Sequence, residues 1–140
     1  MALPKHLRLE FVTPERPIVQ DDVDEVEMPG ELGHIGVLPG HAALLAALQS
    51  GMMWYRKGAE RKYAFVDRGY AEVGADHVSI LARAGERSEE IDIARAEAAK
   101  QRAEEQLAKS RADQDAADAR QALQRAVIRL QVARQTRPRG

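Results

Sequence analysis

The chain has 140 residues, a net charge of −1 and no cysteine. Disulfides, thiolate metal sites and cysteine nucleophiles are therefore excluded. Its longest apolar run, 42–48, is far shorter than the roughly 20 residues that a membrane span needs. Pro4, Lys5, His6 and Arg8 would interrupt the apolar core of a signal peptide. We expect a soluble protein that stays in the compartment where it is made.

The first 90 residues have the pattern of short strands separated by turns. Apolar and polar residues alternate over 6–12, and Pro14 ends this strand. Further strands are predicted at 23–28, 62–66, 70–73 and 78–82. Asp67–Gly69 reads as a hairpin turn with glycine in the left-handed position. Turns at roughly 8–12-residue spacing favour two antiparallel sheets packed as a sandwich.

The segment 30–51 carries glycines at 30, 33 and 36. This spacing is not the dinucleotide-binding fingerprint, and no Lys-Ser/Thr ending marks a phosphate-binding loop. We interpret the segment as a structural loop with several positive-φ positions.

Residues capable of catalysis do not converge in this sequence. The four histidines are scattered without metal-ligand spacing, and no serine lies in a nucleophile elbow. We therefore expect neither an enzyme nor a metal protein.

Residues 91–133 contain no glycine and no proline, and alanine dominates. Two helices are predicted, over 91–109 and 115–135, each with a near-heptad apolar stripe. A short connector makes them an antiparallel hairpin. The fold class is thus α+β: a β-sandwich domain (1–87) followed by a helical hairpin domain (88–140). An alanine seam buries little apolar area, so the sequence is compatible both with an arm that opens and with a static hairpin.

Charge is distributed unevenly along the chain. Residues 1–90 carry 15 acids and 10 Lys or Arg, whereas residues 119–140 carry six arginines and no acid. No aromatic residue lies among these arginines to stack on bases, so an acidic protein surface or a phosphorylated ligand fits better than nucleic acid. A solvated basic tail remains the alternative. Four arginines have helical spacing, which favours an anion held between the helices: Arg95, Arg102, Arg125 and Arg129.

Three features together resemble the epsilon subunit of bacterial F-type ATP synthase. They are the order of sandwich and hairpin, the stretch 30–45 with Gly-Glu-Leu-Gly and Pro-Gly-His-Ala-Ala-Leu-Leu, and the hexad Ile-Asp-Ile-Ala-Arg-Ala at 91–96. The resemblance covers essentially the whole chain. It implies a non-catalytic rotor subunit at the cytoplasmic face of the bacterial cell membrane, attached to the membrane only through its complex.

The resemblance also implies partners and site residues. The sandwich would dock on the gamma subunit and the c-ring, through a loop containing Glu31 and His41. The extended hairpin would reach an acidic segment of the beta subunits of the alpha/beta ring and inhibit ATP hydrolysis, through Arg120, Arg125, Arg129 and Arg134. The folded hairpin would bind ATP as a regulatory ligand, and no cofactor is required.

By position, the implied ATP-binding residues are Glu86, Ile91, Asp92, Arg95, Ala96, Arg102, Arg125 and Arg129. Ile91 and Ala96 would pack on adenine, Asp92 would accept from its amino group, and the arginines would hold the phosphates. Two other functions remain open: a free-standing helical-hairpin adaptor without nucleotide binding, and a small hydrolase.

Overall fold

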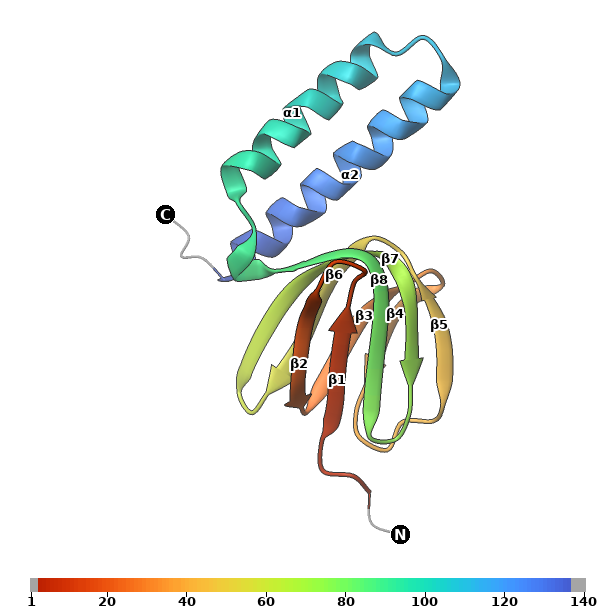
Figure 1. The fold of residues 1–140 in the computed structure, drawn as a ribbon, viewed down its shortest axis with the longest axis vertical. Coiled ribbons are helices and arrows are strands. Elements are labelled where there is room, and N and C mark those ends of the chain that lie inside the picture. The colour runs from red at the N-terminus through yellow and green to blue at the C-terminus, as the bar shows by residue number, and fades with distance from the viewer. Residues whose placement is uncertain (1–2, 137–140) are drawn as a thin grey trace.

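The computed structural model describes residues 3–136, which form eight strands, one 3₁₀ helix and two α-helices (Figure 1). Their bounds in chain order are β1 (Leu7–Val12), β2 (Pro17–Val23), β3 (Glu25–Gly30), β4 (Gly33–Val37), β5 (Leu44–Leu48), β6 (Gly51–Lys57), β7 (Glu60–Val73), β8 (His77–Arg87), η1 (Ser88–Glu90), α1 (Ile93–Lys109) and α2 (Asp113–Thr136). The strands make a sandwich, and the hairpin of α1 and α2 stands on one end of it. The predicted α+β class, with a β-sandwich before a two-helix hairpin, is confirmed.

The strand order is β2-β1-β8-β7-β5-β3-β4, and β6 pairs with both β3 and β7. Neighbouring strands are antiparallel with one exception, since β1 runs parallel to β8 with Leu9 opposite Val78. This parallel pair was not predicted, because alternation along a strand carries no information about the direction of its neighbour.

The structure overturns the predicted hairpin turn at Asp67–Gly69. β7 continues through this segment, and Asp67 and Gly69 pair with Ala84 and Ala82 of β8. Arg68 lies between these two pairs, and it adopts positive φ, at 46°, whereas the glycine does not. A Cβ on Gly69 would overlap the backbone of Leu81, so the close approach of β7 and β8 explains why this residue is glycine.

The segment 30–51 is only partly the loop that we expected. Gly33 and Gly40 do have positive φ, of 133° and 89°. However, β4 and β5 lie within the segment and pair with β3 and β7. The apolar run at 42–48 is explained by β5, whose last residue, Leu48, is buried.

The core lies between the inner faces of the strands. In β1, Leu7, Leu9 and Phe11 are fully buried, while Arg8 is exposed, as the alternating pattern predicts. Burial of such side chains provides most of the stabilisation of the sandwich.

The hairpin has the predicted alanine seam. Asp92 caps α1, because its carboxylate accepts a hydrogen bond from the backbone N–H of Arg95 at 3.1 Å. Small side chains are fully or almost fully buried along both helices: Ala96, Ala103, Ala119 and Ala126. The observed helices begin and end within two residues of the predicted bounds.

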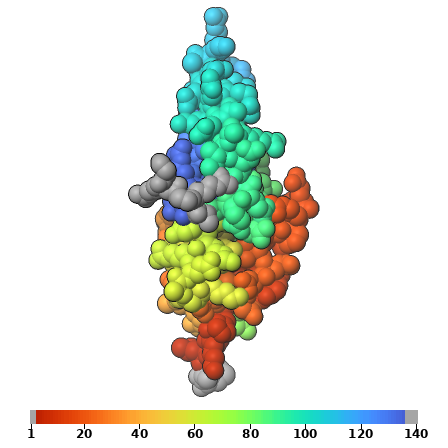
Figure 2. Space-filling view, turned by 90° about the vertical axis from the view of Figure 1, so that its left-hand side faces the viewer, coloured from red at the N-terminus to blue at the C-terminus, as the bar shows by residue number. Residues whose placement is uncertain are grey.

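The end of α2 attaches the hairpin to the sandwich. A second apolar cluster joins Phe65 of β7 to Ile91, Val132 and Ala133. The buried Ser88 hydroxyl donates to the Val132 carbonyl at 2.8 Å. Figure 2 shows the resulting elongated molecule, with the helices at one end and the N-terminal segment at the other.

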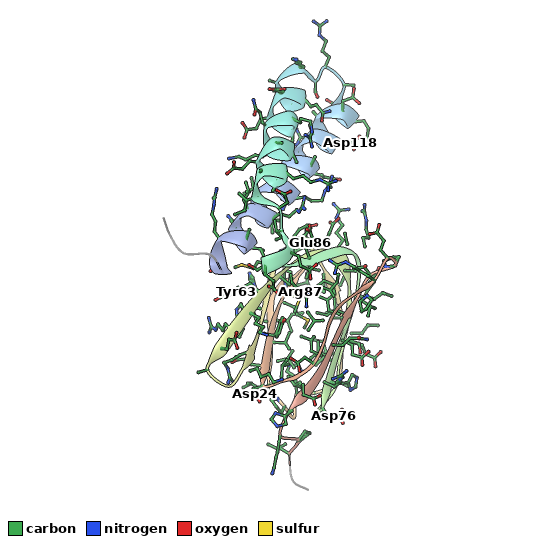
Figure 3. The ribbon with its side chains drawn as sticks, turned by 60° about the vertical axis from the view of Figure 1, so that its left-hand side comes forward. Asp24, Tyr63, Asp76, Glu86, Arg87 and Asp118 are labelled. Atoms are coloured by element: carbon green, nitrogen blue, oxygen red, sulfur yellow. The ribbon has the colours of Figure 1, made fainter. Side chains whose placement is uncertain are left out.

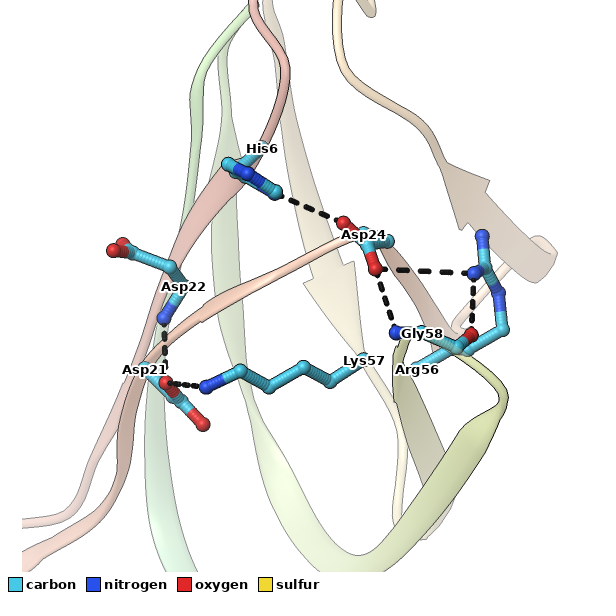
Figure 4. A network of polar contacts seen from close by, with 7 residues as sticks. All are labelled: His6, Asp21, Asp22, Asp24, Arg56, Lys57 and Gly58. Carbon is cyan, nitrogen blue, oxygen red and sulfur yellow. Dashed lines mark hydrogen bonds and ion pairs between the residues drawn. The ribbon is translucent and has the colours of Figure 1, made fainter.

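A polar network closes the opposite end of the sandwich (Figure 4). Asp24 accepts from the backbone N–H of Gly58 at 2.7 Å and lies 2.9 Å from a ring nitrogen of His6, while Lys57 donates to Asp21 at 3.0 Å. These bonds tie the β2–β3 connection to the β6–β7 turn. Within residues 3–136, no helix is both long and apolar enough to cross a membrane.

Candidate functional site: a cleft between hairpin and sandwich

A cleft of about 590 Å³ opens where the hairpin meets the sandwich. Its size is within the usual range for small-molecule sites, roughly 300–1,000 Å³. Both helices, the strands β7 and β8 and the β1–β2 turn contribute to its lining. Figure 3 shows Glu86 and Arg87 at this junction, far from Asp24 and Asp76 at the other end.

Arginines dominate the charge of the cleft. Arg95 and Arg102 come from α1, seven residues apart, and Arg125 and Arg129 come from α2, four residues apart. These spacings place each pair on one side of its helix, and the antiparallel packing brings the two pairs together. Arg16 of the β1–β2 turn is the fifth arginine that lines the cleft. Three carboxylates share the lining, those of Glu15, Asp67 and Glu86, so the cleft has an excess of positive charge.

Arg129 is the most constrained of these cations. Its Nη2 donates to Glu86 at 2.6 Å, and its side chain is only 22% exposed. Its Nε is buried and has no hydrogen-bond partner among the described residues. A buried guanidinium N–H without an acceptor is costly, and an anion entering the cleft could satisfy it.

The wall that the sandwich contributes is partly apolar. Phe65 lies on the cleft and also packs in the cluster with Val132. Beside it, the buried carboxylate of Asp67 accepts a hydrogen bond from the Ser50 hydroxyl at 2.6 Å. The alanines of both helices complete this apolar surface, which could contact a planar ring.

Glu90 lies beside the cleft, between two arginines. Arg16 donates to it at 2.6 Å, and Arg87 forms a second ion pair with it. Burial raises the pKa of Glu90, but the hydrogen bonds from Arg16 and Arg87 outweigh that effect and hold the pKa below its usual value.

The structure brings together five of the eight residues predicted to bind ATP. These five line the cleft: Glu86, Arg95, Arg102, Arg125 and Arg129. Asp92 caps α1 instead, and Ile91 and Ala96 are buried, at 1% and 0% exposure. The sequence analysis missed Arg16, because nothing in the sequence indicates that the β1–β2 turn, far before α1 in the chain, reaches the hairpin.

The residues predicted to contact other subunits lie apart. Glu31 precedes β4 and donates its backbone N–H to Ala47, whereas His41 follows β4. They therefore occupy two loops at opposite ends of a strand, not the single loop that was expected. Arg120 and Arg134 are exposed, while Arg125 and Arg129 line the cleft. Arg137 and Arg139 of the basic end lie outside the described residues.

No group of three or more metal-binding side chains forms within residues 3–136.

The sandwich and the hairpin each match a known family model. Residues 6–88 match the beta-sandwich domain of the ATP synthase delta/epsilon chain, and residues 89–134 match its long alpha-helix domain. The architecture is thus that of a non-catalytic central-stalk subunit of a rotary ATP synthase. The chain belongs to the ATP synthase delta/epsilon chain family.

Several curated relatives match over nearly their whole length. The chain is 46% identical over 128 residues to ATP synthase epsilon chain 2 of Syntrophotalea carbinolica, covering 91% of this chain and 93% of the relative. It is 45% identical over 130 residues to the ATP synthase epsilon chain of Syntrophobacter fumaroxidans, covering 93% and 97%. A chain in the cryo-EM structure of the Euglena gracilis mitochondrial ATP synthase has the same fold, with a TM-score of 0.79 at 22% identity, covering 91% of this chain and 81% of that one.

Proposed function

We propose that this subunit connects the gamma subunit to the c-ring and that its hairpin is an ATP sensor that regulates ATP hydrolysis. The complex would hold it at the cytoplasmic face of the bacterial membrane. The observation that carries the sensor is the cleft itself, where four arginines from two facing helices surround a space large enough for a nucleotide.

The arginines would hold the phosphates. Arg95, Arg102, Arg125 and Arg129 line one cleft, and like charges gathered around one space repel one another unless an anion lies between them. The buried Nε of Arg129 provides a donor that a phosphate oxygen could satisfy. Glu86, which already accepts from Arg129, would keep that guanidinium oriented.

The adenine would lie toward the start of α1, close to Asp92 and Arg95. One carboxylate oxygen of Asp92 caps the helix, and the other would accept from the adenine amino group. Because Ile91 and Ala96 are buried in this conformation, contact with the ring requires the start of α1 to shift.

Regulation would follow from two exclusive uses of the same arginines. In this conformation Arg125 and Arg129 face the cleft, so they cannot also contact an acidic segment of the beta subunits. ATP bound in the cleft would stabilise the folded arm by an amount that grows with its concentration relative to Kd. Low ATP would release the arm, and Arg120, Arg125, Arg129 and Arg134 would then be available to inhibit hydrolysis.

An exposed apolar stripe on the sandwich supports docking on gamma. Tyr70 of β7 pairs with Leu81 of β8 and with Ala47 of β5, so these side chains share one outer face with Leu45. Tyr70, Leu81 and Leu45 are 63%, 59% and 74% exposed. Such a stripe on a surface is typical of an interface. Glu31 and His41 would provide the polar contacts with the c-ring.

Calorimetric titration of the full chain with ATP tests the sensor. We expect saturable binding that Arg95→Ala abolishes or weakens at least tenfold. Arg83→Ala is the matched control, because Arg83 is exposed on β8 and does not line the cleft. Absence of binding at millimolar ATP would overturn the sensor but leave the stalk role intact. Co-purification with gamma, lost in Tyr70→Ser, tests that role separately.

A further inference from the structure

The β1–β2 turn holds Arg16 in a fixed position beside the hairpin. The Thr13 hydroxyl donates to the Arg16 carbonyl at 3.0 Å and accepts from the Arg16 N–H at 3.3 Å. The Thr13 N–H donates to the same carbonyl, also at 3.0 Å. Three local bonds thus fix the backbone of this turn, which lies at the hairpin end of the sandwich (Figure 1). A guanidinium carried by such a turn loses less conformational entropy when it binds.

Arg16 binds the segment that joins the two parts of the molecule. Its partner Glu90 is 74 residues away, in η1 between the end of β8 and the start of α1. Glu90 is 24% exposed, and Arg87 holds it from the sandwich side. The ion pair therefore spans from the first turn of the sandwich to the root of the hairpin.

The position of η1 depends on the docked hairpin. Ser88 of η1 donates to Val132, and Ile91 packs against Val132 and Ala133. Release of α2 from the sandwich breaks both contacts, and η1 then loses part of the support that holds Glu90 beside Arg16. The Arg16–Glu90 pair and the docked hairpin thus stabilise each other.

We infer that the Arg16–Glu90 ion pair is a latch that sets how readily the hairpin leaves the sandwich, acting on the arm rather than on the nucleotide. This inference rests on the proposed mobility of the hairpin. Arg16 lines the cleft, but its Nη2 is already committed to a carboxylate, unlike the Nε of Arg129. Arg16 is accordingly a positioning residue.

Thiol accessibility measures opening directly, because the chain has no cysteine. In the full chain carrying Val132→Cys, a nearly isosteric change at a fully buried site, a thiol reagent reacts only when the hairpin opens. Without nucleotide, we expect Arg16→Ala and Glu90→Gln each to raise the labelling rate about two- to fivefold, the range for a partly exposed ion pair. The double variant should react no faster than Glu90→Gln alone.

The control is Arg8→Ala, which removes an arginine whose ion pairs lie within the sandwich, with Glu10 and Asp22. It should leave the rate unchanged. Unchanged rates in Arg16→Ala and Glu90→Gln would overturn the latch, as would additive effects in the double variant. If Arg16→Ala left nucleotide-free labelling unchanged but removed protection by ATP, Arg16 would be a ligand contact instead. Absence of ATP protection in the parent chain would sink the proposed sensor, while the nucleotide-free rates would still decide the latch.

Discussion

Arg129 of α2 and Glu86 of β8 form an ion pair of 2.6 Å across the boundary between hairpin and sandwich. Both side chains are about three-quarters buried, so neither charge is well screened by water. The pair therefore links the position of α2 to the C-terminal end of β8. It also holds the Arg129 guanidinium, a candidate phosphate-binding group, in the cleft without ligand.

Removing one partner of this pair should destabilise the docked hairpin. We expect Arg129→Met to lower the free energy of unfolding by about 1–2 kcal/mol, between the values for exposed and buried pairs, because Glu86 loses its counter-ion. The double variant Glu86→Gln/Arg129→Met should recover part of that loss. Urea unfolding of the parent chain, Arg129→Met, Glu86→Gln and the double variant gives the coupling energy of the pair. Strictly additive losses would contradict the pairing.

Asp92 has a structural role in the cap and a proposed role at adenine, and two substitutions separate them. Asp92→Ala should cost about 1 kcal/mol, because the Arg95 N–H loses its cap. Asp92→Ser keeps a capping oxygen and should preserve stability. If the carboxylate accepts from adenine, Asp92→Ser should nevertheless weaken ATP binding in calorimetry. Equal affinity in Asp92→Ser and the parent chain would leave Asp92 with the capping role alone.

Gly69→Ala should be among the most damaging small substitutions in the sandwich. The added Cβ would overlap the Leu81 backbone, which cannot rotate away as a side chain can. We expect a loss of about 3 kcal/mol, at the upper end of overpacking effects. Gly36→Ala is the control, since its Cβ would meet nothing within 4 Å. Thermal unfolding of both variants provides the comparison, and similar melting temperatures would argue against the close approach of β7 and β8.

His77 should make the stability of the sandwich depend on pH. The hydrogen bond to Asp76 is the main cause that raises the pKa of His77, against a smaller opposing effect of burial. A raised folded-state pKa stabilises the protonated form, so this contribution is complete below about pH 6.5 and disappears as pH rises through the folded value. The parent chain should therefore melt above His77→Gln at about pH 5.5, and this gap should close at about pH 9. Asp76→Asn should remove most of the gap, and a gap that is independent of pH would refute the assignment.

Local sequence patterns predicted one strand and both helices accurately. Alternation in 6–12 placed Leu7, Leu9 and Phe11 on the buried face of β1, and the absence of glycine and proline over 91–133 located both helices. The arginine spacing grouped Arg95, Arg102, Arg125 and Arg129 on the two packed helices, and all four line one cleft. Local periodicity was sufficient for these results, because each depends on residues within a few turns of one another.

Several of the errors and omissions involve contacts distant in sequence. Gly69 looks like a turn residue, but its role is set by β8 and became clear only with the pairing of Ala82. Arg16 carried no signal, since its partner Glu90 lies 74 residues away. Likewise, the burial of Ile91 depends on Val132. The pattern of one element at a time does not indicate that these two residues are in contact.

The parallel pairing of β1 with β8 also has a consequence for synthesis on the ribosome. β1 can pair with β2 early, but its other edge has no partner until residues 77–81 have emerged. The hairpin must wait longer, because the groups that attach it, Val132 and Ala133, follow β8 in the chain and are made after it. A nascent chain therefore completes its sandwich before it acquires its folded arm, since domains generally fold in order from the N-terminus.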